Sequence, residues 1–94
     1  MSDAVKTERW VQSAQADGTL AGDRAAIYHR ETRKAVTLNS VGTVLWQALE
    51  VPRSRAELAG EITTRWPQVE QARAEADVDR FLEELRGHQL IVVA

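Results

Sequence analysis

Two histidines and a run of acidic residues are the side chains in this sequence that could carry chemistry. His29 and His88 lie far apart in the chain, and no carboxylate stands three or four residues after either one to complete a ligand pair. Cysteine is absent, which excludes disulfides and thiolate metal sites. The sequence also lacks a glycine-rich phosphate loop and a G-x-S-x-G nucleophile motif. We therefore expect no catalytic site, no metal site and no cofactor.

The acidic run falls between Glu70 and Arg86, where helical periodicity is strong. Its carboxylates could form a cation cluster, but helical spacing spreads them around an exposed arc with arginines between them. A salt-bridged solvent face is the simpler interpretation. The segment has six acidic residues against three arginines, and the whole chain has a net charge of −2. Both values are unfavourable for binding nucleic-acid phosphates. The run comprises Glu75, Asp77, Asp79, Glu83 and Glu84, with Arg73, Arg80 and Arg86 interleaved.

The elements that must position these side chains fit one domain, at residues 9–94, after a flexible N-terminus at residues 1–8. Three antiparallel strands come first and three helices follow, so the predicted fold class is α+β, with a winged-helix outline. Trp46 and Trp66 are expected on core faces of the helices. The predicted strands are 9–15, 24–31, 35–38 and a last short one at 89–93, with a turn at 16–23. The predicted helices begin after Asn39 or Ser40, after Ser54, and between residues 68 and 71. The last helix runs to Arg86, with Gly87 as its C′ residue.

The strand at 35–38 passes directly into a helix, and it could be an edge of the sheet. A free edge is either protected or used for pairing. Arg33 and Lys34 at its start could be gatekeepers against aggregation, or they could steer an acidic peptide to the edge. The sequence leaves both interpretations open. No signal peptide or membrane-length apolar run is present, so we expect a cytoplasmic protein that does not bind membranes.

Three segments taken together resemble the PqqD family. They are TLNSVGTVLWQAL, SRAELAGEITTRW and EADVDRFLEELRGHQLI, and the resemblance covers roughly residues 20–93. Family members often have an Asp-Gly turn after the first helix, where this chain has EVPRS. The features that carry the resemblance are Leu38–Asn39, Gly42, Leu45–Trp46, Leu58, Ile62, Asp77–Val78, Phe81–Leu82, Leu85 and Leu90.

The resemblance implies a peptide-binding domain of the RiPP recognition element type, not an enzyme. Such domains hold the leader region of a ribosomally made precursor peptide for a modifying enzyme, such as a radical SAM maturase, a leader protease or a cyclase. The leader would add a strand at 33–38 and lie against the last helix. The implied peptide-binding residues are Arg33, Lys34, Ala35, Val36, Thr37 and Leu38 from the strand, and Val78, Phe81, Leu82, Glu75, Asp79 and Arg86 from the helix. The opposite flank of that helix, with Asp77 and Glu84, is an equal alternative.

Two other functions stay open at this stage. One is a winged-helix DNA-binding protein, and the other is a regulatory domain that docks on an enzyme without any leader peptide. The free sheet edges also allow either a monomer or a homodimer.

Overall fold

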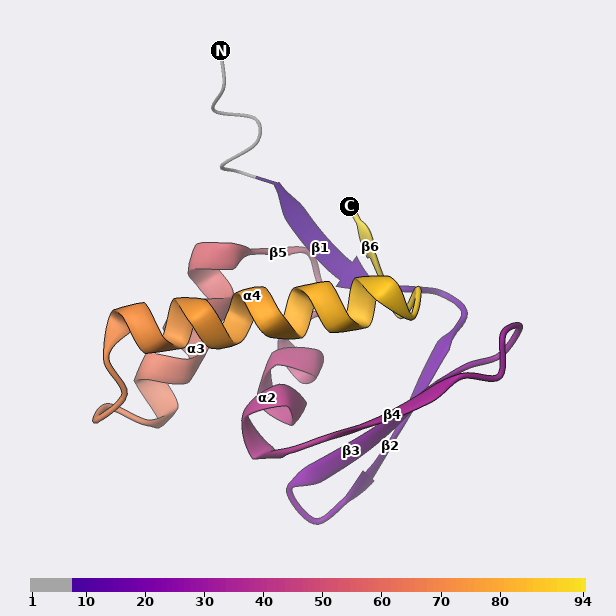
Figure 1. The fold of residues 1–94 in the computed structure, drawn as a ribbon, viewed down its shortest axis with the longest axis horizontal. Helices are drawn as coiled ribbons and strands as arrows, with labels where there is room; N and C mark the ends of the chain where they lie inside the picture. The colour runs from indigo at the N-terminus through magenta and orange to yellow at the C-terminus, as the bar shows by residue number, and fades with distance from the viewer. Residues whose placement is uncertain (1–7) are drawn as a thin grey trace.

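The structure, a computed structural model, describes residues 8–94 and contains three helices and two three-stranded antiparallel sheets (Figure 1). Apart from Glu8, the flexible N-terminus predicted at 1–8 lies outside the described residues. None of the described helices is both long and apolar enough to cross a membrane. The elements are β1 (Arg9–Gln12), β2 (Ala16–Ala21), β3 (Arg24–His29), β4 (Ala35–Leu38), α2 (Ser40–Ala48), β5 (Arg53–Ser54), α3 (Arg55–Arg65), α4 (Gln71–Gly87) and β6 (Ile91–Val93).

The predicted winged-helix-like α+β class is confirmed, because a three-stranded sheet of order β2-β3-β4 precedes three helices. The composition of that sheet differs from the prediction. The strand at Arg9–Gln12 does not join it, but pairs with β5 on one side and β6 on the other to form a second sheet. Residues 16–21, predicted as a turn, are instead the edge strand β2.

The prediction missed β2 because nearly all of its side chains are exposed, so no alternation of apolar and polar residues marks it. Ala21 pairs with Arg24, which leaves Gly22 and Asp23 as a two-residue hairpin turn. Gly22 has a φ of 67°, a left-handed conformation that glycine adopts without steric cost. The glycine signal was therefore correct, but it marks two residues and not eight.

The predicted caps of the first two helices are present. The Asn39 side chain accepts a hydrogen bond from the Gly42 N–H at 2.8 Å, at the start of α2. Ser54 and Glu57 form the predicted capping box of α3. The end of α4 differs, because Gly87 is its last helical residue and Gln89 takes the left-handed conformation, with a φ of 61°.

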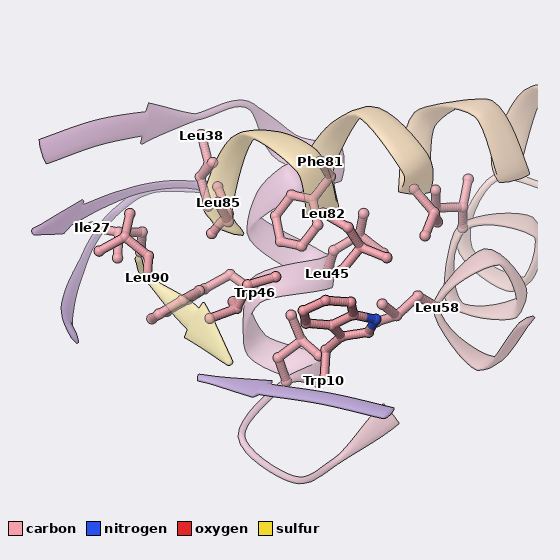
Figure 2. Packing of buried hydrophobic residues seen from close by; sticks show 14 of the residues in the cluster. Trp10, Ile27, Leu38, Leu45, Trp46, Leu58, Phe81, Leu82, Leu85 and Leu90 are labelled. Atoms are coloured by element: carbon pink, nitrogen blue, oxygen red, sulfur yellow. The ribbon is translucent and has the colours of Figure 1, made fainter. Parts of the chain in front are cut away.

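The core lies where α2, α3 and α4 meet the inner faces of the two sheets. In Figure 2, Phe81 and Leu82 of α4 point toward Leu45 of α2 and Trp10 of β1. Trp46 is buried as predicted, and Trp10 seals the second sheet. Trp66 packs only partly against this cluster, because it is the C-cap residue of α3, where the chain turns away toward Pro67.

Candidate functional site

The free edge of β4 is the first feature of the candidate site. In the sheet order β2-β3-β4, strand β4 has β3 as its one neighbour among residues 8–94, and its other edge faces α4 (Figure 1). The His29 N–H donates to the Lys34 carbonyl at 2.9 Å, so His29 and Lys34 form a hydrogen-bonded pair, and this pair sets which residues of β4 bond to β3 (the phase of the ladder). Because hydrogen-bonded and non-bonded pairs alternate in an antiparallel ladder, Ala35 and Thr37 direct their N–H and C=O groups to the free edge.

A groove of about 290 Å³ lies between this edge, the first turns of α2 and one flank of α4. The apolar residues of its floor are Val41, which is partly exposed, and Leu38, Leu45 and Phe81, which are buried beside it. A strand in this groove would thus have unpaired backbone groups on one side and a narrow apolar floor, inside a largely polar lining, beneath its side chains. The rest of the lining is Thr37, Asn39, Gly42, Arg73, Asp77, Arg80 and Glu84.

The junction between β4 and α2 fixes the position of the edge. Asn39 caps α2 directly after Leu38, so no flexible residue separates the strand from the helix. A Cβ atom at Gly42 would lie 3.3 Å from the Leu38 Cβ, so the glycine lets the end of β4 pack closely on the first turn of α2. A rigid edge reduces the ordering cost when a flexible peptide pairs with it.

The turn before β4 is held by a buried histidine. His29 is only 4% exposed, and its Nδ1 accepts hydrogen bonds from the N–H groups of Glu31 and Thr32, each at 3.1 Å. Arg33 closes this turn in the left-handed conformation, with a φ of 65°. Arg33 and Lys34 both lie exposed at the start of β4.

The rim of the groove along α4 carries paired charges. Asp77 lies 3.5 Å from Arg73 and 3.7 Å from Arg80, and so bridges residues one turn before it and one turn after it. The Asp77 side chain is 22% exposed, whereas those of Arg73 and Arg80 are 73% and 76% exposed. One carboxylate therefore serves two guanidinium groups that both remain largely in solvent.

Glu75, Asp79 and Arg86, the charged helix residues that the family resemblance implied as peptide-binding, do not line this groove. Asp79 and Glu75 face α3, where Arg55 hydrogen-bonds to Asp79 at 2.5 Å and lies 3.8 Å from Glu75. The hydrogen bonds that Arg55 donates to the Asp79 carboxylate lower the pKa of Asp79 and raise the pKa of Arg55. The Arg86 guanidinium stacks over the Trp10 ring, 6.0 Å from its centroid.

Asp79 and Arg86 instead border a second hollow, of about 430 Å³, between α4 and β1, together with Trp10, Arg80, Leu82 and Glu83. Of the apolar helix residues named by the sequence analysis, Phe81 lines the groove, whereas Val78 is fully buried and Leu82 faces β1. From the strand, Thr37 and Leu38 line the groove.

Sequence reasoning did not single out Arg73, Arg80 and Gly42 as groove residues, and it left Asp77 and Glu84 as the alternative flank. The apolar stripe on α4 consists of Ala74, Val78, Phe81, Leu82 and Leu85. Both of its flanks carry charges of both signs, so the sequence alone does not distinguish one flank from the other. The side on which β4 lies determines which flank borders the groove, and that is a property of the tertiary structure. Among residues 8–94, no three His, Asp or Glu side chains gather as a metal site requires.

Comparison with known proteins adds four findings. Residues 24–91 match the family described as Coenzyme PQQ synthesis protein D (PqqD). The fold resembles the solved structure of TbiB1 in complex with the TbiA(beta) leader peptide, with a TM-score of 0.78 and 23% identity over 86% of this chain and 93% of that one. It also resembles lasso peptide synthetase B1 complexed with the leader peptide, with a TM-score of 0.75 and 17% identity over 88% and 96% of the two chains. No curated protein matches the sequence. At these identities the structural likeness establishes the fold.

Proposed function

This chain belongs to the PqqD family, and we propose that it is a non-catalytic peptide chaperone that binds the leader region of a ribosomally made precursor peptide. The leader adds a strand to the free edge of β4 and lies in the groove between β4 and α4. The domain then presents the peptide to a modifying enzyme in the cytoplasm, such as a radical SAM maturase, a leader protease or a cyclase. The structural relatives, both described as complexes with leader peptides, support this proposal.

The observation that carries the proposal is the pairing of a free backbone edge with an apolar floor. Strand addition requires unpaired N–H and C=O groups for affinity and pockets for alternate side chains for selectivity. Ala35 and Thr37 supply the backbone groups, and the partly exposed Val41 supplies the apolar floor together with the edges of the buried Leu38 and Phe81.

The flank of α4 is revised from the sequence-based hypothesis. Asp77 and Glu84, with Arg73 and Arg80, border the proposed site, whereas Glu75, Asp79 and Arg86 serve contacts with α3 and β1. A DNA-binding alternative has no comparable support, because α4 has an excess of carboxylates.

The test is Thr37→Pro, which removes an N–H that points to the free edge and leaves the β3–β4 ladder intact. The leader half of the short peptide encoded nearest to the gene is titrated into isotope-labelled protein, and amide shifts are followed. We expect saturable shifts in residues 35–38 and along the Arg73–Glu84 flank. The substitution should weaken binding by about ten-fold or more, because a buried peptide carbonyl loses its partner, while the thermal midpoint falls only modestly.

Leu20→Pro is the matched control. The ladder phase directs the Leu20 N–H to the outer edge of β2, so this variant places the same ring at the opposite edge of the same sheet. It should bind the peptide as the wild type does. Equal weakening by both variants, or equal loss of folding and binding in Thr37→Pro, would contradict strand addition at β4.

A further inference from the structure

Two exposed arginines on the rim of the groove share one carboxylate. Arg73 and Arg80 both bridge to Asp77, so two guanidinium groups stand against one carboxylate and these three residues have a net charge of +1, whereas the chain as a whole has a net charge of −2. Glu84, the other charged residue of the lining, lies one turn beyond Arg80. The segment of the rim from Arg73 to Arg80 therefore favours an anionic partner.

The spacing of the two rim arginines limits where the partner's charges can lie. Arg73 and Arg80 are seven residues apart, a separation of about 10.5 Å along the helix axis. In an extended peptide, side chains on one face recur about every 6.8 Å, so positions i and i+4 are about 13.5 Å apart. The long arginine side chains absorb the difference of about 3 Å. Positions i and i+2 would leave no side chain between the arginines to reach the floor.

The position between the arginines excludes charge. Asp77 lies there, one turn from each arginine and already bridged to both. A carboxylate at the middle position of the peptide would meet Asp77 and destabilise the complex. An apolar side chain at that position instead points to the floor of Leu38, Val41 and Phe81. Glu84, four residues beyond Arg80, disfavours an acidic side chain past the end of the pattern.

We infer that the groove selects an acidic peptide of the pattern acid–x–apolar–x–acid, with the two carboxylates held by Arg73 and Arg80 and the apolar side chain on the groove floor. The pattern reads the same in both directions, so it does not depend on the polarity of the bound strand. This inference rests on the proposed function, since it requires a peptide strand at the edge of β4.

The test is selection from a phage-displayed library of random nonapeptides on the full-length protein. We expect enriched sequences with two Asp or Glu residues four positions apart and an apolar residue midway. The double variant R73Q/R80Q should still select the apolar residue but lose the acidic preference. The wild-type consensus peptide should bind this variant about two- to thirty-fold more weakly, as expected for two exposed charge pairs, and the difference should shrink in high salt.

The control is R24Q/R65Q, which makes the same change in net charge at two exposed arginines that do not line the groove. It should select and bind as the wild type does. Enrichment of apolar residues without acidic ones, or of Lys and Arg, would overturn this inference and leave the proposed function standing. Enrichment of no sequence at all would overturn both.

Discussion

The ion pair between Arg55 and Asp79 is a surface contact that joins α3 to α4. It has two hydrogen bonds, at 2.5 and 2.8 Å, and both side chains are about half exposed. An exposed pair of this kind contributes only about 0.2–1 kcal/mol to the free energy of unfolding. Asp79 thus pairs with α3, and it does not line the groove of β4.

Asp79→Asn should therefore lower the free energy of unfolding slightly and leave leader binding unchanged. The pKa of Asp79 is lowered in the folded state, so its contribution is present above the unfolded value of about 3.9 and is lost as the pH falls through the folded pKa. At pH 7 the free energy of unfolding of the variant should be lower than that of the wild type by at most about 1 kcal/mol. This difference should shrink as the pH falls from 5 to 3. Urea unfolding at several pH values measures it. A deficit independent of pH, or a loss of peptide binding, would refute this assignment.

The choice of flank on α4 shows how far single residues could be interpreted from the sequence. The apolar stripe and the edge residues Thr37 and Leu38 followed from periodicity, and the structure brings Phe81 to these strand residues in the groove. Charges alone could not distinguish the two flanks, because a helix with carboxylates on both sides offers the same side chains to either neighbour. The structural role of His29 was not predicted either. Its ring accepts two hydrogen bonds from backbone N–H groups of its own turn, and backbone groups leave no signal in the sequence.

The C-terminal end of α4 lies two residues later than its glycine signal predicts. Gly87 was expected outside the helix, but it is the last helical residue and His88 is the cap. Gln89 is in the left-handed conformation. The Leu90 N–H donates to the Leu85 carbonyl at 2.9 Å, which is the hydrogen bond that spans six residues in a Schellman motif. Leu90 is fully buried, so the chain must turn where this side chain reaches the core. Burial of Leu90 therefore outweighs the preference of glycine for the left-handed position.

This conflict predicts that the end of α4 can be stabilised. Gln89→Gly removes the steric cost of a left-handed non-glycine residue, which is about 1–2 kcal/mol before the entropy cost of glycine. Gly87→Ala adds a methyl group with no atom within 4 Å, and should add about 0.5–1 kcal/mol. Each 1 kcal/mol raises the thermal midpoint by about 4–8 °C in a domain of this size, so calorimetry detects either change.

Gly22→Ala is the matched control for these substitutions. It also places a methyl group in open space, but at a φ of +67°, where an alanine is strained. It should lower the midpoint, while Gly87→Ala raises it. The same sign of change at both glycines would show that backbone conformation does not decide the effect.

The second sheet joins the first described strand, the middle and the C-terminal end of the chain, and the sequence analysis did not predict that these strands pair with one another. Strand β1, from the first described residues, pairs with β6 from the C-terminal end of the chain and with β5 from its middle. Each strand is only two to four residues long, too short for a clear periodic signal. The last strand was expected, but its partner was not, because pairing between distant short strands depends on how the helices bring them together. The family match begins at Arg24, so β1 lies outside it.

Removal of residues 90–94 should therefore unfold the entire domain and not merely shorten it. The deletion takes away β6 with Leu90 and Ile91, which are fully or almost fully buried. Burial of each side chain contributes about 1.5–3 kcal/mol, and the cavity left in the core adds to the loss. The sum approaches the total of about 5–15 kcal/mol that stabilises a small domain. Deletion of Val93 and Ala94 alone, both exposed, should leave a folded protein with a lower midpoint. Circular dichroism during heating compares the two. A cooperative transition in the longer deletion would mean that the groove between β4 and α4 is stable without the second sheet, and that the sheet serves another purpose than holding α4 in place.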